Sequence, residues 1–273
     1  MGVTETVVCL ENVRFARGGR TIFDDISVEI AAGEITAIMG PSGTGKTTLM
    51  RLITGQLQPQ QGKITVLGED IGQLNRKQLM QLRRRISMMF QNNALFTDMT
   101  VGENVAFPLK EVLNMDQALI DIIVSLKLQT VGLRGAAHLM PSELSGGMAR
   151  RAALARAMVM EPELMIYDEP FTGQDPISLA MLTSLVKNLN RGLGMSSLVV
   201  SHDLVEVCRI ADKILLLSAG KIAAYDTPER LMASDDPLVA QFFHGYADGP
   251  VAFHYPAVDY RQELLGGEDA DHR

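Results

Sequence analysis

The stretch GPSGTGKT at residues 40–47 decides the fold. It follows EITAIMG (34–40), an apolar run that predicts a strand, and opens TTLMRLITG (47–55), whose apolar residues recur at helical spacing. Glycines allow backbone N–H groups to approach phosphates, and a helix N-terminus adds positive partial charge. We expect Lys46 to reach the β- and γ-phosphates and the Thr47 hydroxyl to bind Mg²⁺. The sequence therefore predicts a nucleoside triphosphate site, lined by Gly40, Pro41, Ser42, Gly43, Thr44, Gly45, Lys46, Thr47 and Thr48.

The rest of the chain alternates strand-like and helix-like segments. Runs rich in β-branched and apolar residues predict strands at 7–15, 22–30, around 63–67, and at 163–170, 196–203 and 213–225. Residues 92–159 are dominated by helix formers and predict an inserted, mostly helical subdomain. This alternation indicates an α/β fold with a largely parallel sheet. We expect one domain over residues 1–240 and a C-terminal extension over 241–273.

Composition narrows the class of protein. The chain has 273 residues, 47% of them hydrophobic, which is ordinary for a globular α/β protein. A formal net charge of −7 argues against a nucleic-acid partner. The basic run Arg83-Arg84-Arg85 is interpreted as the solvated face of a helix. The start MGVTETVV does not resemble a signal peptide, and the apolar runs are shorter than the roughly 20 residues of a membrane span.

A second motif fits the phosphate loop. LMIYDE (164–169) is an apolar run that ends in two carboxylates, as expected where a strand end meets a metal-bound phosphate. Asp168 would hold Mg²⁺ through its water shell, and Glu169 would orient and deprotonate the attacking water. Taken alone, a strand ending in Asp-Glu is more often only a solvated strand end.

LSGGM (144–148) distinguishes between classes of phosphate-loop protein. It offers a hydroxyl and free N–H groups at a helix start, which would form a second anion site. Together with the phosphate loop and the Asp-Glu strand, it resembles the nucleotide-binding domain of ABC transporters over about residues 7–235. The resemblance implies a phosphate-loop NTPase of ABC type and a head-to-tail homodimer that encloses two ATP molecules. Ser145, Gly146 and Gly147 would then contact the γ-phosphate bound by the opposite subunit.

The resemblance extends to three further residues. It implies that Gln91 senses Mg²⁺ and the attacking water, that Asp175 lies along the dimer seam, and that His202 hydrogen-bonds the γ-phosphate. A lone histidine after an apolar strand would otherwise be read as structural. The sequence also departs from the family pattern: Met148 replaces the usual glutamine of LSGGQ, and Gln174 replaces a leucine.

The base-binding position also departs from the family pattern. Arg17 stands where the family carries an aromatic ring against adenine. A guanidinium plane also stacks on a base, so Arg17 is assigned this role. Phe15 is its rival; strand alternation places it on the same face, and it could equally belong to the core.

The run NNALFTDMTVGENVAFPL (92–109) is similar to the ATPases of Mla and Mce lipid transport systems. That resemblance implies a peripheral protein on the cytoplasmic face of the inner membrane, which moves phospholipids to or from periplasmic carriers and so maintains outer-membrane lipid asymmetry. It implies three partners besides a second copy of the chain: an MlaE-type permease, an MCE-domain lipid-binding protein (MlaD) and a STAS-domain protein (MlaB).

Two alternatives stay open at this point. The first is an ABC ATPase that serves a transporter for an amino acid or another small solute. The second is a soluble ABC ATPase outside transport. For the C-terminal extension we expect Phe253, Tyr255 and Tyr260 to anchor on another subunit, with packing against its own domain as the alternative.

Overall fold

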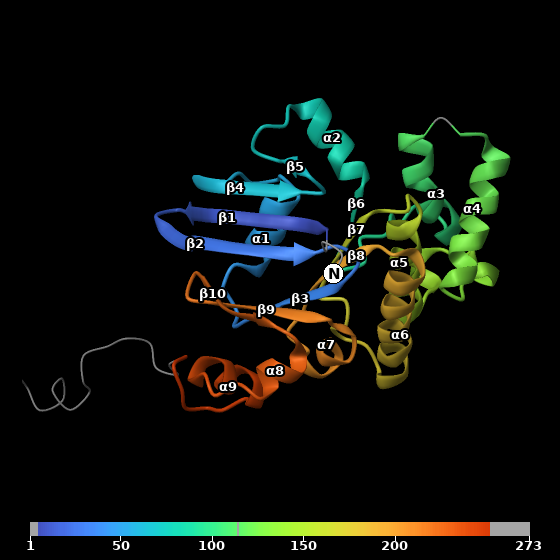
Figure 1. Cartoon of the computed structure of the whole chain (residues 1–273). Coiled ribbons are helices and arrows are strands. Elements are labelled where there is room, and N and C mark those ends of the chain that lie inside the picture. Colours follow the sequence, from blue (N-terminus) through green and yellow to red (C-terminus); the bar gives the residue numbers. More distant parts are fainter. Residues whose placement is uncertain (1–4, 114, 252–273) are drawn as a thin grey trace, which may run out of the picture.

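The computed structural model describes residues 5–113 and 115–251, and its centre is a parallel sheet. The strand order in this sheet is β10-β9-β3-β8-β7-β6 (Figure 1). Only β10 runs antiparallel to its neighbour among these strands. Every residue of β3 and β8 is buried, as expected for strands covered on both faces. The bounds are β3 Ile35–Met39, β6 Ile86–Met89, β7 Leu164–Asp168, β8 Ser196–Val200, β9 Lys213–Ser218 and β10 Lys221–Asp226.

A smaller antiparallel sheet has the order β2-β1-β4-β5. β1 and β2 form a hairpin in which Arg17 faces Arg20. The connection is Gly18-Gly19, with φ of 57° and 78°, the left-handed pair that a tight hairpin turn needs. The strands predicted at 7–15 and 22–30 are thereby confirmed. The bounds are β1 Thr6–Arg17, β2 Arg20–Ala31, β4 Gln61–Val66 and β5 Glu69–Asp70.

Helix α1 (Lys46–Ile53) joins the two sheets into one core. Its Leu49 and Ile53 belong to the same cluster of buried residues as Val13 of β1 and Ile38 of β3. The cluster fixes the start of α1 directly behind the loop that follows β3. The phosphate-loop position is therefore held by packing on both sides.

The segment 92–159, for which the sequence predicts helices, contains α3, α4 and α5. They pack against one another beside the parallel sheet (Figure 1). Thr100 and Glu103 form a capping box that starts α3. The bounds are α3 Val101–Val112, α4 Gln117–Thr130 and α5 Gly146–Met158, with short 3₁₀ turns η1 Arg134–Ala136 and η2 Pro141–Glu143.

The remaining helices follow the strands in chain order. Their bounds are α2 Arg76–Arg84, α6 Pro176–Leu193, α7 Leu204–Ile210, α8 Pro228–Met232 and α9 Pro237–His244. α9 runs across residue 240, where the sequence places the end of the domain. After α9 the chain folds back, and the Gln241 amide exchanges two hydrogen bonds with the Val251 backbone. Phe253, Tyr255 and Tyr260 lie outside the described residues.

The interpretation of Arg83-Arg84-Arg85 as a solvated helix face is wrong for two of the three. Arg83 donates to the Thr54 and Gly55 carbonyls at the end of α1. Arg85 forms a two-pronged ion pair with Glu163, which precedes β7. Only Arg84 is exposed. Arg83 and Arg85 therefore hold α2 and the start of β6 against neighbouring segments.

Among the helices within residues 5–113 and 115–251, none combines the length and the apolar character that a bilayer span requires.

Candidate functional site

The phosphate loop has the backbone that its glycines predict. Gly40, Gly43 and Gly45 have φ of 142°, 80° and 100°, values that side chains disfavour. A Cβ on Gly45 would meet Phe23 Cζ at 2.8 Å, so the loop also lies tightly against β2. Among the described residues no side chain caps the start of α1, and its first turn carries no acid. The helix N-terminus therefore remains available to an anion.

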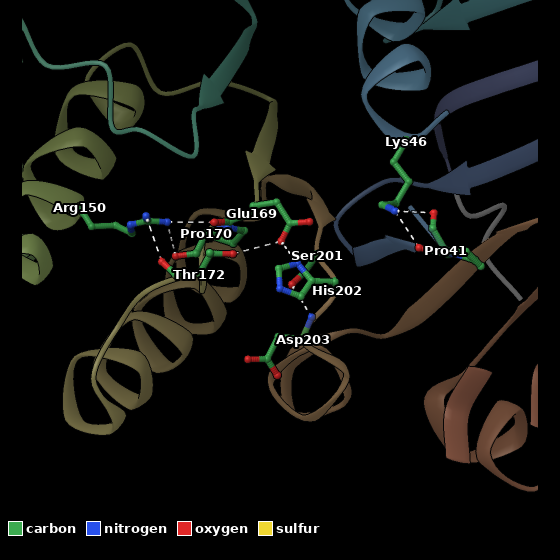
Figure 2. A network of polar contacts seen from close by, with 10 residues as sticks. Pro41, Lys46, Arg150, Glu169, Pro170, Thr172, Ser201, His202 and Asp203 are labelled. Atoms are coloured by element: carbon green, nitrogen blue, oxygen red, sulfur yellow. Dashed lines mark hydrogen bonds and ion pairs between the residues drawn. The ribbon is translucent and has the colours of Figure 1, made fainter. Parts of the chain in front are cut away.

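Lys46 is half-buried at the start of α1. Its Nζ donates to the Gly40 carbonyl at 2.7 Å and to the Pro41 carbonyl at 3.1 Å (Figure 2). Burial lowers the pKa of Lys46, and the negative charge of Glu169 opposes that shift. The ammonium is thus held over the phosphate loop within the electrostatic reach of the Glu169 carboxylate, which follows β7.

The carboxyl ends of the parallel strands bring the predicted residues together. Gln91 follows β6, Asp168 ends β7 and is followed by Glu169, and His202 follows β8. The Glu169 N–H donates to the Val200 carbonyl at 2.8 Å, which continues the β7–β8 pairing. Parallel strands end on one edge of a sheet, so these side chains share the edge at which the phosphate loop leaves β3.

Glu169 and His202 contact each other directly. Glu169 Oε2 lies 2.8 Å from His202 Nδ1, and Thr172 Oγ1 lies 3.4 Å from the same oxygen (Figure 2). The Glu169 side chain is 16% exposed, whereas that of His202 is 67% exposed. Glu169 has φ of 50°, a left-handed conformation that is strained for this residue. Such strain is frequent at reactive positions.

Asp168 is suited to a divalent cation. Burial raises the pKa of this carboxyl group, the charge of Glu169 raises it further, and Arg51 opposes both. Burial and the neighbouring carboxylate thus disfavour the ionised form of Asp168 when no cation is bound. The oxygens of Asp168, Thr47 and Gln91 are the hard donors that Mg²⁺ prefers.

The LSGGM segment lies at the start of α5. Ser145 is its exposed N-cap, and Ser145 Oγ accepts from the Met148 N–H at 3.3 Å. The Met148 side chain packs against the core, which explains how an apolar residue is accommodated at that position. No hydrogen bond among the described residues joins Ser145–Gly147 to the phosphate loop. Asp175, which the resemblance predicts to lie along a dimer seam, caps α6 and accepts from the N–H groups of Ile177 and Ser178.

The end of the site where the sequence predicts base binding combines predicted and unpredicted residues. Phe15 is 6% exposed and belongs to the core, whereas Arg17 is exposed at the end of β1. A cavity of about 330 Å³ adjoins the phosphate loop. It is lined by Arg20, Thr21, Ile22, Ser42, Gly43, Thr44, Ala219 and Gly220. No local sequence signal marks Ala219-Gly220, because the β9–β10 turn joins the cavity only through folding.

A larger cavity of about 610 Å³ lies elsewhere. It is bordered by Glu163 and Ser196, at the amino ends of β7 and β8. Ligands of open α/β sheets bind at the carboxyl ends of the strands. The residues that follow β6, β7 and β8 are therefore a better candidate for the catalytic site than the lining of this cavity.

Comparisons with known proteins identify the family of the chain. The family model described as ABC transporter matches residues 23–172. The intermembrane phospholipid transport system ATP-binding protein MlaF of Haemophilus influenzae is 52% identical over 96% of this chain and 100% of its own length. The MlaF protein of Escherichia coli is 54% identical over 96% of this chain and 97% of its own length.

A solved structure shares the fold. It is described as a dimeric, post-hydrolysis state of the ATP-binding cassette MJ0796 bound to ADP and Pi. It superposes with a TM-score of 0.73 at 28% identity, covering 81% of this chain and 98% of that one. The family match, the identity to full-length relatives and the strand-end geometry lead to one conclusion. This chain belongs to the ABC transporter family, as an ATP-hydrolysing subunit.

Proposed function

We propose that this chain hydrolyses ATP to drive phospholipid movement between the inner membrane and periplasmic carriers, which maintains outer-membrane lipid asymmetry. The observation that carries the enzymatic part is the Glu169–His202 pair at the strand edge that also bears the phosphate loop. The assignment of phospholipid as the substrate rests on sequence identity of 52% and 54% to proteins named for phospholipid transport, over 96% of the chain.

ATP binds with its phosphates over the glycine loop at the start of α1. Lys46 gives up its two carbonyl contacts and donates to the β- and γ-phosphates, whose charge stabilises its ammonium. Thr47, Asp168 and Gln91 would hold Mg²⁺, which would offset the charge that develops on the phosphates. Arg17 stacks on adenine at the exposed end of β1.

Hydrolysis uses the two residues that contact each other. Glu169 orients the attacking water and takes its proton as the water oxygen bonds to the γ-phosphorus. His202 Nδ1 is engaged by Glu169, so the other ring nitrogen is available to the γ-phosphate. The Glu169 carboxylate is largely shielded from bulk water, which strengthens its interaction with the attacking water.

The site is completed by a second copy of the chain. Ser145, Gly146 and Gly147 are exposed or half-exposed at the start of α5, where unpaired N–H groups are available to an anion. In a head-to-tail homodimer they contact the γ-phosphate held by the opposite subunit, and Asp175 lies along the seam. Closure of this dimer around two ATP molecules supplies the mechanical step.

The work is passed to a membrane partner. We place the chain peripherally on the cytoplasmic face of the inner membrane, bound to an MlaE-type permease. The further components are an MCE-domain lipid-binding protein (MlaD) and a STAS-domain protein (MlaB). The MlaF proteins that resemble this chain are named for an intermembrane phospholipid transport system, which supports this assembly.

The proposal is tested by affinity purification of the tagged Glu169→Gln protein from detergent-solubilised membranes, with mass spectrometry of proteins and lipids. The wild-type chain and Lys46→Ala serve as controls for nucleotide-dependent trapping. Recovery of a polytopic permease together with phospholipid supports the proposal. A different permease without lipid would overturn the substrate, and purely soluble partners would overturn transport itself.

A further inference from the structure

Arg150, on the second turn of α5, binds four backbone carbonyls that belong to two separate segments. Its Nη1 donates to the Glu169 carbonyl at 2.9 Å and to the Pro170 carbonyl at 2.7 Å. Its Nη2 donates to the Gln91 carbonyl at 2.9 Å and to the Thr172 carbonyl at 3.3 Å. Figure 2 shows the guanidinium pointing from α5 toward the turn that carries Glu169. One side chain therefore joins three parts of the molecule: α5, the end of β7 and the end of β6.

This arrangement is costly for stability. Arg150 is 6% exposed, and burial lowers the pKa of its guanidinium. No carboxylate among the described residues pairs with it, and its Nε has no hydrogen-bond partner there. A buried charge that is neutralised only by carbonyl dipoles stabilises a fold less than apolar packing of the same volume. Stability alone therefore does not account for an arginine at this position.

Two of the four carbonyls that Arg150 binds belong to Gln91 and Glu169, the residues proposed above to act on the attacking water. Gln91 and Glu169 come from different strands, and the two nitrogens of one rigid guanidinium set their separation. Arg150 also reaches the Glu169 side chain indirectly: it binds the Thr172 carbonyl, and Thr172 Oγ1 lies 3.4 Å from Glu169 Oε2. A displacement of Arg150 would therefore move both the backbone of Glu169 and, through Thr172, its side-chain carboxylate.

The same helix also carries the segment that faces the other subunit. Ser145 caps α5 five positions before Arg150, about 7 Å along a helix that rises 1.5 Å per residue. Further along α5, Arg156 donates to the Asn93 and Ala94 carbonyls, two residues in left-handed conformations. α5 thus holds residues 91–94 at three carbonyls, while its start presents Ser145 to the opposite site.

We propose that Arg150 is a positioning residue that couples the two ATP sites of the homodimer. When Ser145 engages the nucleotide of the opposite subunit, α5 is fixed, and Arg150 then fixes Gln91 and Glu169 in its own subunit's site. Hydrolysis at one site therefore depends on nucleotide at the other. This inference rests on the dimer and on the roles of Glu169 and Gln91 proposed above.

The test compares Arg150→Lys and Arg150→Gln with the same two changes at Arg151. Arg151 is the neighbouring arginine on α5, and within the described part of the chain its side chain donates only to the Val131 carbonyl, away from the strand-end site. ATPase rates of the purified full-length chain are measured against ATP concentration with Mg²⁺, and folding is followed by thermal melting. Lysine retains the charge but cannot reach four carbonyls, so Arg150→Lys tests the geometry even where the glutamine variant unfolds.

We expect the Arg150 variants to lose about 10- to 100-fold in kcat, because small displacements of catalytic groups have effects of this size. The KM for ATP should stay at the wild-type value, and the Hill coefficient should fall to about 1. The Arg151 variants should keep both kcat and the Hill coefficient. A purely structural role would lower kcat only in proportion to the unfolded fraction.

The failure of this inference is distinguishable from failure of the proposed function. If Glu169→Gln is inactive while folded Arg150→Lys keeps its kcat and Hill coefficient, the coupling role is wrong and the ATPase assignment stands. A wild-type Hill coefficient of about 1 would likewise overturn the coupling. If Glu169→Gln hydrolyses ATP at the wild-type rate, the proposed function itself is wrong.

Discussion

Glu169 Oε2 lies 2.8 Å from His202 Nδ1, so the carboxylate after β7 and the imidazole after β8 are direct partners across adjacent strands. The pair is asymmetric, because the carboxylate is mostly buried and the imidazole is mostly exposed. The carboxylate is therefore the fixed member, and the imidazole is the member with freedom to turn toward a ligand. The contact holds the two side chains together at the sheet edge where the phosphate loop leaves β3.

The first prediction concerns this pair. Glu169→Gln should lower kcat by about 10²- to 10⁴-fold, the usual contribution of a general base, while ATP binding is retained. His202→Ala should also lower kcat, because Glu169 then loses its 2.8 Å partner. Steady-state ATPase assays and equilibrium binding of ATP separate the two effects. A matched control is His244→Ala at the end of α9. Normal turnover in Glu169→Gln would contradict the base assignment.

The second prediction concerns Lys46. Saturating ATP at about 100 times its Kd should stabilise the wild-type fold by about 2.7 kcal/mol, or about 5–10 °C in melting temperature. Lys46→Ala should abolish this shift, because the side chain that would bind the β- and γ-phosphates is gone. Lys77→Ala, an exposed lysine on α2, should keep it. Differential scanning fluorimetry with and without ATP gives the answer. An unchanged shift in Lys46→Ala would exclude its role in phosphate binding.

The third prediction follows from the raised pKa of Asp168. Burial first, and then the charge of Glu169, raise the pKa of this carboxyl above its ordinary 3.8. A carboxyl whose pKa is raised by folding destabilises the protein when ionised. This penalty is complete above the folded pKa, shrinks as the pH falls through it, and is absent below the unfolded value.

Asp168→Asn carries no charge at any pH, so without nucleotide it should melt about 1–4 °C above the wild type at about pH 7. The difference should narrow toward about pH 4, while Mg²⁺-dependent ATP hydrolysis is lost. Melting curves across this pH range measure the effect, with exposed Asp235→Asn as the control. A lower melting temperature for Asp168→Asn would show that its carboxylate stabilises the fold.

The parts of the fold and site that could be predicted depend on neighbouring residues in the chain. Gly18-Gly19 indicates a hairpin, because few other residues adopt two successive positive φ angles. The phosphate loop and α1 are recognisable for the same reason, since the glycines and Lys46 act through local backbone geometry. The runs at 164–167 and 198–200 are apolar, and they lie in the buried strands β7 and β8.

Contacts between distant segments could not be predicted in this way. Arg150 binds carbonyls 19 and 59 residues away, and a carbonyl has no side-chain identity that a pattern would reveal. The sequence predicts a solvated face for Arg85, because its partner Glu163 is 78 residues away and no local pattern reveals it. From the sequence alone, each of these arginines resembles a surface charge, because its partners come close only in the folded sheet.

The last prediction concerns the base. Arg17 and Arg20 face each other across the β1–β2 hairpin, and both are exposed. A guanidinium stacked on an aromatic face contributes about 0.5–2 kcal/mol, so Arg17→Ala should raise the KM for ATP by about 2- to 30-fold. Its kcat should not change, because the base contact is equal in the ground and transition states.

Three further variants locate the contact. Arg17→Tyr should restore the KM, since an aromatic ring offers the same stacking face. Arg14→Ala, which breaks only an exposed contact to Asp24 at 3.5 Å, should leave the KM unchanged. If Arg20→Ala raises the KM and Arg17→Ala does not, the base binds in the cavity that Arg20 lines beside Ser42–Thr44. In that case the hairpin would still bind adenine, but through the strand that leaves the turn rather than the one that enters it.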